Sequence, residues 1–438
     1  MKIPQNGAGG AVSAAAVILA GLVATGTPAQ ATEGYFQHGF GALSKMMAGT
    51  GAAYSQDAMS QALNPAGLVG IDNQLNADLS FFSPHREFDA EGGSDPFRLV
   101  PNDKVKSDRE IFFIPSVAAS YQIDDLSAVG VALYGNGGMN TSYDGGDATC
   151  SLGSGGVFCD GTAGVDLMQA FLQFTYAREI PQLEVPGVLE RFAIGVGPIV
   201  AYQRFEAKGL SQFGVFGFSS DPSNLTNNGH DESFGLGARF GIQAELPANV
   251  GLGVTYQLRT YMDEFDDYKG LFAEQGDFDI PPALQVGVSW NPIPELTLLF
   301  DYKRIWYNDV DAVGNEFSSS GLLGDDNGPG FGWENTNIFK FGAQWQADEQ
   351  WMLRAGYSYT DQPIDDSEVL FNILAPAVME HHITGGVEYK LNDNHTLQLA
   401  GMFAPETTLS GRNPLDSSQK IKLKMYQYEV TLGYAWHF

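Results

Sequence analysis

Four basic residues are the first candidates for chemistry in this sequence. Each lies on the small or polar face of a segment with alternating apolar residues: Arg239, Arg259, Lys303 and Arg354. A desolvated cation binds a carboxylate through charge-assisted hydrogen bonds. We therefore treat them as candidate contacts for an anionic ligand. The alternative is ordinary pairing with carboxylates of the lumen such as Asp301, Glu388 or Glu429, and a neutral ligand would need no cation at all.

A second candidate is an apolar cluster in the otherwise polar segment 208–231. It comprises Leu210, Phe213, Phe216 and Phe218, with Val215 between them. Apolar side chains exposed in a polar loop favour a capture patch for a hydrophobic ligand. Packing against a neighbouring loop that contains Val157 and Phe158 is a compatible alternative.

Glycines surround an asparagine in one strand-like segment, at Gly135, Asn136, Gly137 and Gly138. Glycine weakens a strand and permits a bulge or a kink. A kinked strand is therefore predicted here, with simple close packing as the alternative.

Cys150 and Cys159 enclose eight residues that are rich in glycine and serine. In an oxidising compartment this spacing favours a structural disulfide that closes a small loop. A metal site is the alternative, but no histidine lies nearby in the sequence.

Catalytic motifs of the common hydrolase, metalloprotease and P-loop types are absent from the sequence, so we predict no enzyme, no cofactor and no resident metal. The adjacent His381 and His382 would point to opposite faces of a strand and do not form a metal pair. Acidic loops could hold divalent cations or form a solvated rim, and we favour the rim. They contain Asp263, Glu264, Asp266, Asp267, Asp365, Asp366 and Glu368.

The elements that must position these residues are strands. Residues 426–438 alternate between an apolar face, ending in Trp436 and Phe438, and a mostly polar one, and thirteen further segments between residues 74 and 404 show comparable patterning. Short turns and long polar loops, such as 405–421, alternate between them. Fourteen is an even number, and this loop pattern is typical of a bacterial outer-membrane barrel. We predict an all-β, 14-stranded antiparallel transmembrane β-barrel over residues 73–438.

The N-terminal region differs from this pattern. Lys2, an apolar run at 11–24 and Ala29-Gln30-Ala31 predict a cleaved signal peptide over residues 1–31. Residues 32–72 lack sustained alternation and predict a plug in the barrel lumen, with a periplasmic tail as the alternative. The Asn64, Pro65 and Ala66 step is expected to form a turn that fixes the plug to the wall.

The plug sequence resembles the hatch of the FadL family of outer-membrane transporters. The resemblance rests on residues 34–36, 48–54, 57–58 and 64–67, and the segment 134–140 lies where that family has a kinked strand. It implies a hatch-plugged 14-stranded barrel in the outer membrane of a Gram-negative bacterium. It also implies loop capture of a hydrophobic ligand, lumen binding, a hatch shift and lateral release at the third strand.

Composition agrees with that reading. With 23 Lys+Arg against 52 Asp+Glu, the net charge of −29 argues against nucleic acid as a partner. The expected ligand is a long-chain fatty acid. Uptake of aromatic or alkane hydrocarbons and a general diffusion porin are the alternatives. Further expected partners are outer-membrane lipid, lipopolysaccharide and the barrel assembly machinery.

Overall fold

The computed structural model describes residues 33–95, 98–144, 150 and 155–438, so the predicted signal peptide lies outside the described residues. One antiparallel sheet closes on itself, because the first strand pairs with the last over residues 74–92. Fourteen strands form this closed barrel, as predicted. Its wall consists of β1 (Gln74–Gly92), β3 (Phe112–Asp124), β4 (Ser127–Asn140), β5 (Gly164–Glu179), β6 (Arg191–Lys208), β7 (Asp231–Leu246), β8 (Val250–Gln257), β10 (Ala283–Ile293), β11 (Leu296–Ile305), β12 (Thr336–Gln346), β13 (Trp351–Thr360), β14 (His381–Asn392), β15 (His395–Asn413) and β16 (Asp416–His437). Two short strands, β2 (Asp103–Lys106) and β9 (Tyr261–Met262), pair only with β1 and β7, respectively.

Alternation along each strand separates a lipid-facing surface from the lumen. On β1, Leu75 and Leu79 are exposed, whereas Gln74, Asn76 and Asp78 are buried. An apolar exterior around a polar interior is the arrangement that a transmembrane barrel requires. No helix in the described part of the chain has the length and apolar character needed to cross a membrane.

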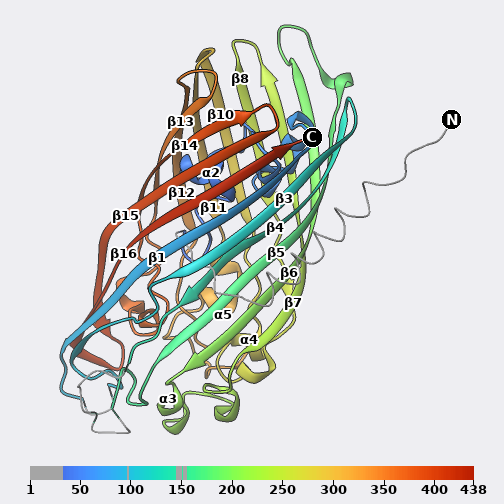
Figure 1. Ribbon diagram of the computed structural model, residues 1–438. Coiled ribbons are helices and arrows are strands. Elements are labelled where there is room, and N and C mark those ends of the chain that lie inside the picture. The colour runs from blue at the N-terminus through green and yellow to red at the C-terminus, as the bar shows by residue number, and fades with distance from the viewer. Residues whose placement is uncertain (1–32, 96–97, 145–149, 151–154) are drawn as a thin grey trace, which may run out of the picture.

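Short turns lie at one end of the barrel and long connections at the other (Figure 1). The long connections gather at the lower end in that view. They carry α3 (Ser211–Val215), α4 (Ala273–Gly276), α5 (Asp311–Gly314), η4 (Pro222–Asn224), η5 (Asp266–Tyr268), η6 (Tyr307–Asp309), η7 (Asp366–Glu368) and η8 (Phe371–Ile373), and η3 (Pro181–Leu183) lies in a turn at the opposite end.

One predicted loop is wrong. Residues 405–421 do not form a long loop, because β15 continues to Asn413 and β16 begins at Asp416. β1 likewise runs on to Gly92. These extensions pair with one another beyond the belt of exposed apolar residues that faces the lipid. They therefore lack the hydrophobic outer face by which membrane strands are recognised.

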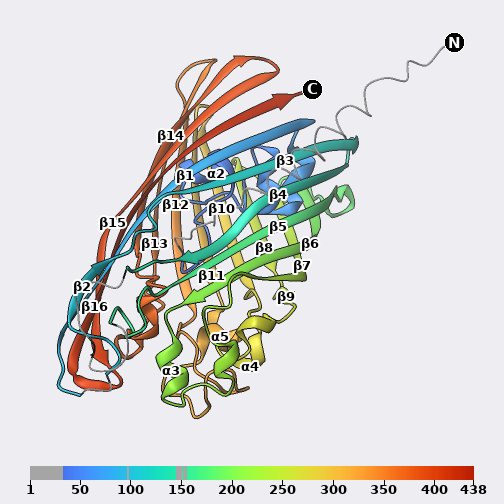
Figure 2. The same ribbon diagram turned by 60° about the horizontal axis from the view of Figure 1, so that its bottom comes forward.

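Residues 33–73, hereafter the lumenal segment, run inside the barrel, where α2 (Gly41–Met46) is seen behind the wall (Figure 2). Two short helices follow, η1 (Ala58–Ala62) and η2 (Pro65–Gly70). Wall carboxylates hold the backbone of this segment: Asp301 accepts the amides of Gly51 and Ala52 at 3.1 and 2.9 Å. The lumen is thus filled by chain whose backbone is hydrogen-bonded to the wall at these points.

Candidate functional site

The wall is interrupted beside β4. β4 pairs with β3 only as far as Leu133, and its remaining residues pair with β5. A register shift between Gly135 and Gly137 leaves Asn136 as the extra residue on the β4 side. The β3 residues 112–116 pair with β1 but not with β4 among the described residues. The strand therefore bulges where the glycines are clustered, and a stretch of its edge is released from the wall.

The released edge of β4 pairs with the lumenal segment instead. Phe36 forms a bridge with Gly137. The Gly138 amide donates to the Tyr35 carbonyl at 3.0 Å, and the Gln37 amide donates to the Asn136 carbonyl at 3.1 Å. A Cβ atom at Gly137 would lie 1.8 Å from the Tyr35 oxygen, so only glycine permits this approach. The bulge and the close packing considered from the sequence thus occur together.

A cavity opens next to this bulge. Gly34, Gly138, Met139, Trp333 and Leu374 are among its lining residues. Backbone of the lumenal segment and of β4 therefore faces apolar side chains from the long connections. This cavity lies beside the gap in the wall.

A second cavity lies on the other side of the same segment. Phe36, Phe40 and Leu63 line it together with two of the predicted cations, Arg239 and Lys303. The structure thus brings together two candidates that are 64 residues apart in the sequence. An apolar wall with two cations suits a molecule that has one anionic end.

Arg239 is buried and has neutral partners. Its guanidinium donates to the Tyr134 hydroxyl at 3.2 Å and to the Gln257 side chain. It also lies over the Phe40 ring at 5.6 Å. None of the ion pairs found among the described residues involves Arg239. A buried guanidinium without an anion is unusual, because its desolvation is not offset by an opposite charge.

Lys303 is already paired. Its ammonium lies 2.6 Å from Glu33, whose other carboxylate oxygen lies 2.5 Å from Lys340. Glu33 is fully buried at the start of the lumenal segment. Sequence reasoning missed Glu33 and Lys340. The only available signal was their charge, because their proximity depends on how the segment lies in the barrel.

The other two predicted cations lie elsewhere. Arg259, just beyond β8, pairs with Asp279 at 2.6 Å and with Asp277 at 3.5 Å. Arg354 lies near the short turns, 3.5 Å from Glu388, and donates to Gln344 and Gln56. For these two residues the ordinary pairing alternative describes the structure. The four candidates therefore do not form one site.

The turn at Asn64, Pro65 and Ala66 rests directly on the wall. The Asn64 side chain caps η2 by accepting the Ala66 amide at 3.0 Å and donates to the Ala52 carbonyl at 2.7 Å. A Cβ at Gly241 would lie 1.9 Å from the Asn64 side-chain oxygen. Glycine on the wall thus makes room for this turn.

The aromatic loop is folded inward rather than open. Leu210 and Phe213 are completely buried, so the expectation of an exposed patch is wrong for them. Phe213 packs against Phe158 at 5.5 Å and against Phe371 at 5.3 Å between ring centroids. Phe216 and Phe218 are half-buried against the same cluster. The neighbouring-loop alternative is therefore what the structure shows.

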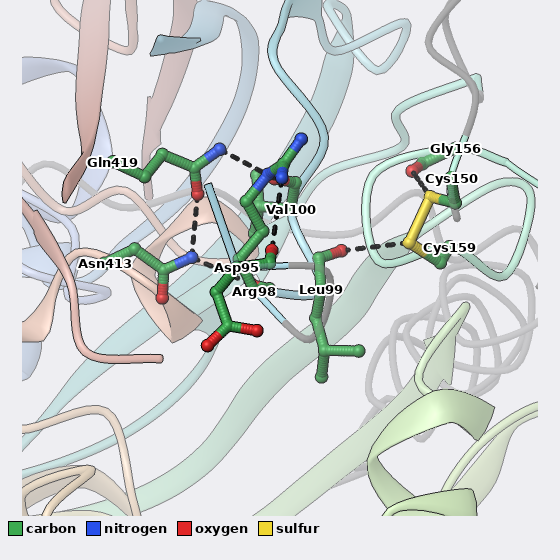
Figure 3. The surroundings of a disulfide bond; sticks show 9 residues. All are labelled: Asp95, Arg98, Leu99, Val100, Cys150, Gly156, Cys159, Asn413 and Gln419. Carbon is green, nitrogen blue, oxygen red and sulfur yellow. Dashed lines mark hydrogen bonds between the residues drawn. A yellow bond between two sulfur atoms is a disulfide. The ribbon is translucent and has the colours of Figure 1, made fainter. Parts of the chain in front are cut away.

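Cys150 and Cys159 are joined by a disulfide (Figure 3), with a Cα–Cα distance of 5.5 Å. The Cys159 sulfur lies 3.4 Å from the Leu99 carbonyl oxygen. The Leu99 segment is held in turn by the β15–β16 hairpin, since Gln419 donates to Val100 at 2.7 Å. The loop that carries Phe158 is thus fixed at its base.

His381 and His382 point to opposite sides, as their adjacency requires. His382 is completely buried and stacks near His38, whereas His381 lies outside beside Tyr357. Among the described residues, the single group with metal-ligand geometry is not in the acidic loops that the sequence suggested.

A closed barrel with a filled lumen, a side opening and two internal cavities defines an outer-membrane transport barrel. Residues 21–425 match the family of outer membrane protein transport proteins (OMPP1/FadL/TodX), and the chain belongs to it. The long-chain fatty acid transport protein of Escherichia coli O6:H1 is 23% identical over 384 residues, covering 81% of this chain and 84% of that protein.

Solved structures agree in fold. The toluene transporter TodX of Pseudomonas putida has a TM-score of 0.67 at 18% identity, with 92% of this chain and 99% of that chain covered. A FadL homologue of Pseudomonas aeruginosa has a TM-score of 0.66 at 14% identity, with 92% and 100% covered. The fold, the outer-membrane location and the family expected from the hatch sequence are thereby confirmed.

Proposed function

We propose that this transporter carries hydrophobic molecules with an anionic head, long-chain fatty acids first among them, passively across the outer membrane. The observation that carries the proposal is the buried Arg239, which has only neutral partners in a cavity walled by Phe36, Phe40 and Leu63. A ligand carboxylate would compensate this charge, and the phenyl and leucyl groups would bury the adjoining alkyl chain. A neutral hydrocarbon would leave the guanidinium uncompensated.

The path is proposed to begin among the extracellular loops. There a small apolar cavity is lined by Leu271, Phe272, Phe331, Phe371 and Leu374. Leu374 also lines the cavity at the β4 bulge. Apolar surface on both sides of one residue offers a hydrophobic ligand a continuous route inward. The buried Leu210 and Phe213, and Phe216 and Phe218 beside them, support this cavity wall in place of an exposed patch.

Release is proposed to occur through the side of the barrel. Gly34 lines the cavity at the bulge, and Phe36 lines the cavity that holds Arg239. The lumenal segment at residues 33–37 is therefore the partition between the two. A shift of this partition would join them and bring the ligand to the β4 edge that β3 leaves unpaired. The bulge at Gly135, Asn136, Gly137 and Gly138 supplies the lateral opening.

The remainder of the lumenal segment is proposed to act as a hatch. Asn64, Pro65 and Ala66 fix one part of it against the wall, so a shift at residues 33–37 need not release the whole. Deleting residues 32–64 tests this role, because a hatch-plugged transporter becomes an ion-conducting pore in a planar bilayer. Unchanged conductance would favour a general diffusion porin.

The decisive experiment compares two ligands with the same chain and different heads. Proteoliposomes would be assayed for uptake of oleic acid and of oleyl alcohol by wild type, Arg239→Met and the matched control Arg354→Met, whose arginine already has a carboxylate neighbour. We expect Arg239→Met to reduce uptake of the acid at least tenfold while sparing the alcohol. Equal uptake of both ligands by every variant would refute the anionic-head proposal and favour hydrocarbons.

Native mass spectrometry of the detergent-purified protein gives an independent readout. A co-purified fatty acid that excess competitor displaces, and that Arg239→Met no longer retains, would support the proposal. A retained neutral hydrocarbon would contradict it while leaving the fold and the route intact.

A further inference from the structure

Three side chains with metal-binding chemistry meet on the outer face of the barrel, away from the ligand path. Asp166 on β5 and Glu206 on β6 are directly opposite in the register, and His230 immediately precedes β7. Even-numbered residues of β5 and β6 face outward, as the exposed Phe174, Ile194 and Val200 show. Asp166 and Glu206 thus come from adjacent strands and His230 from the residue before the next one, all on the lipid-facing side near its extracellular end.

The cluster lies above the apolar belt. Tyr202 and Phe234, with ring centroids 5.2 Å apart, mark the last aromatic layer on β6 and β7. Glu232 and Arg204 follow them as opposed residues in the register. Asp166, Glu206 and His230 then form the next layer on the same face. Aromatic residues of this kind mark the membrane interface, so the cluster is outside the hydrocarbon and accessible from water.

Its geometry fits a single ion. One ligand atom from each of the three residues lies within 4.8 Å of the others. His230 Nε2 is 3.3 Å from Asp166 Oδ2 and 3.7 Å from Glu206 Oε2. Like charges directly opposite each other on paired strands are destabilising. Lys208, whose ammonium is 2.9 Å from Glu206, offsets the negative charge of that carboxylate. The negative charge of Asp166 remains to be offset by His230 or by a bound cation.

The donor set selects the kind of ion. Calcium and magnesium take oxygen ligands throughout, whereas an imidazole nitrogen suits zinc and its first-row neighbours. One histidine and two carboxylates supply three ligands at a zinc ion, which takes a fourth from water. We propose that Asp166, Glu206 and His230 form a binding site for a zinc-class divalent cation.

Glu206 and His230 stand near the two ends of the connection that carries α3 and η4. An ion shared by them closes the base of that loop, and Asp166 ties it to β5. Because Phe213 in this loop packs on the cavity-lining Phe371, the ion stiffens a wall of the extracellular entry. Cation binding at this site therefore acts on the loop and not on the lumen.

The test uses full-length protein in detergent, with any affinity tag removed and metal stripped by a chelator. Calorimetric titration with zinc chloride is expected to show one site, which is weakened at least tenfold by His230→Ala and by Glu206→Gln. His395→Ala is the matched control, because His395 is a strand-end histidine at the opposite end of the barrel, bonded to Tyr434. Heat-modifiable gel mobility confirms that every variant is folded.

Cobalt provides a spectroscopic signature of an ion bound at this site. Visible cobalt absorption that is present in wild type and His395→Ala but lost in His230→Ala would support the site. Zinc affinity that is equal in all variants, or no zinc binding by wild type, would overturn the proposal. Preferential binding of calcium at the same residues would also overturn it, because the site would then not use the imidazole.

Discussion

Gly137→Val tests how the lumenal segment is held against β4. The new Cβ would lie 1.8 Å from the Tyr35 oxygen, where ordinary contact begins at 3.4 Å, so the backbones must separate by 3.4 − 1.8 = 1.6 Å. Hydrogen bonds at 3.0 Å (Gly138 to Tyr35), 3.1 Å (Gln37 to Asn136) and 2.8 Å (Gln37 side chain to Gly135) would then be lost. At about 1 kcal/mol each, their loss costs about 3 kcal/mol.

That cost corresponds to a roughly hundredfold rise in the population of molecules in which residues 33–37 have separated from β4. Hydrogen–deuterium exchange in detergent measures it directly, and the Gln37 and Gly138 amides should exchange about a hundredfold faster if local opening controls the rate. Gly401→Val is the matched control, because its new Cβ would lie no closer than 4.0 Å to the Gly385 carbonyl oxygen. Unchanged protection of both amides in correctly folded Gly137→Val would refute the reasoning.

Three further predictions concern stability. Asn64→Ala removes the cap on the Ala66 amide and the bonds to the Ala52 and Ile242 carbonyls, and should destabilise the docked lumenal segment by about 2–3 kcal/mol, seen as its faster proteolysis. Burial and the neighbouring Asp279 charge raise the pKa of Asp277 to about 7. A carboxyl whose pKa is raised on folding destabilises the folded loop at pH values above that pKa, where the carboxyl is charged. The loop that contains Asp277 should therefore gain protection from protease as the pH falls from 8 to 5. Asp277→Asn should abolish this change. Replacing Cys150 and Cys159 by serine should cost the loop about 2–3 kcal/mol, measured by its protease sensitivity against the oxidised wild type, and the reduced wild type should behave like the variant.

The membrane-spanning part of the fold was predictable because lipid imposes a strict pattern. Every wall strand must be paired, and its outer face must be apolar, so residues 426–438 were recognisable from alternation alone. The same rule explains the error at 405–421. Residues such as Glu406 and Ser410 lie on strands that extend into water, where no apolar outer face is required.

The site was predictable only in part. Glycine composition indicated the bulge at β4 because glycine has a local backbone meaning. The partner of Lys303 was not predictable, since Glu33 reaches it from 270 residues away through the path of the lumenal segment. The burial of Phe213 was predicted only as an alternative, through packing against the loop of Phe158, and its contact with Phe371 in another loop was missed.

In the proposed mechanism, the charges that hold residues 33–37 in place also set the condition for moving them. Glu33 compensates Lys303 and Lys340 in a buried site, and withdrawing one partner of such a pair typically costs about 3–5 kcal/mol. An arriving carboxylate between Arg239 and Lys303 could replace Glu33 and offset that cost, whereas a neutral ligand could not. A ligand shifts an equilibrium only by its differential affinity for the two states, so only the acid would favour the displaced partition.

Glu33→Gln separates this coupling from simple blockage. The variant leaves Lys303 without its anion, so retention of oleic acid in the detergent-purified protein should rise, and residues 33–37 should exchange faster even without ligand. Oleyl alcohol retention should stay unchanged, because no charge is involved. Arg354→Met again serves as the control for loss of a charge elsewhere in the lumen. Equal gains for acid and alcohol would mean that Glu33 merely holds the partition shut, and the exchange of one carboxylate for another would then be refuted.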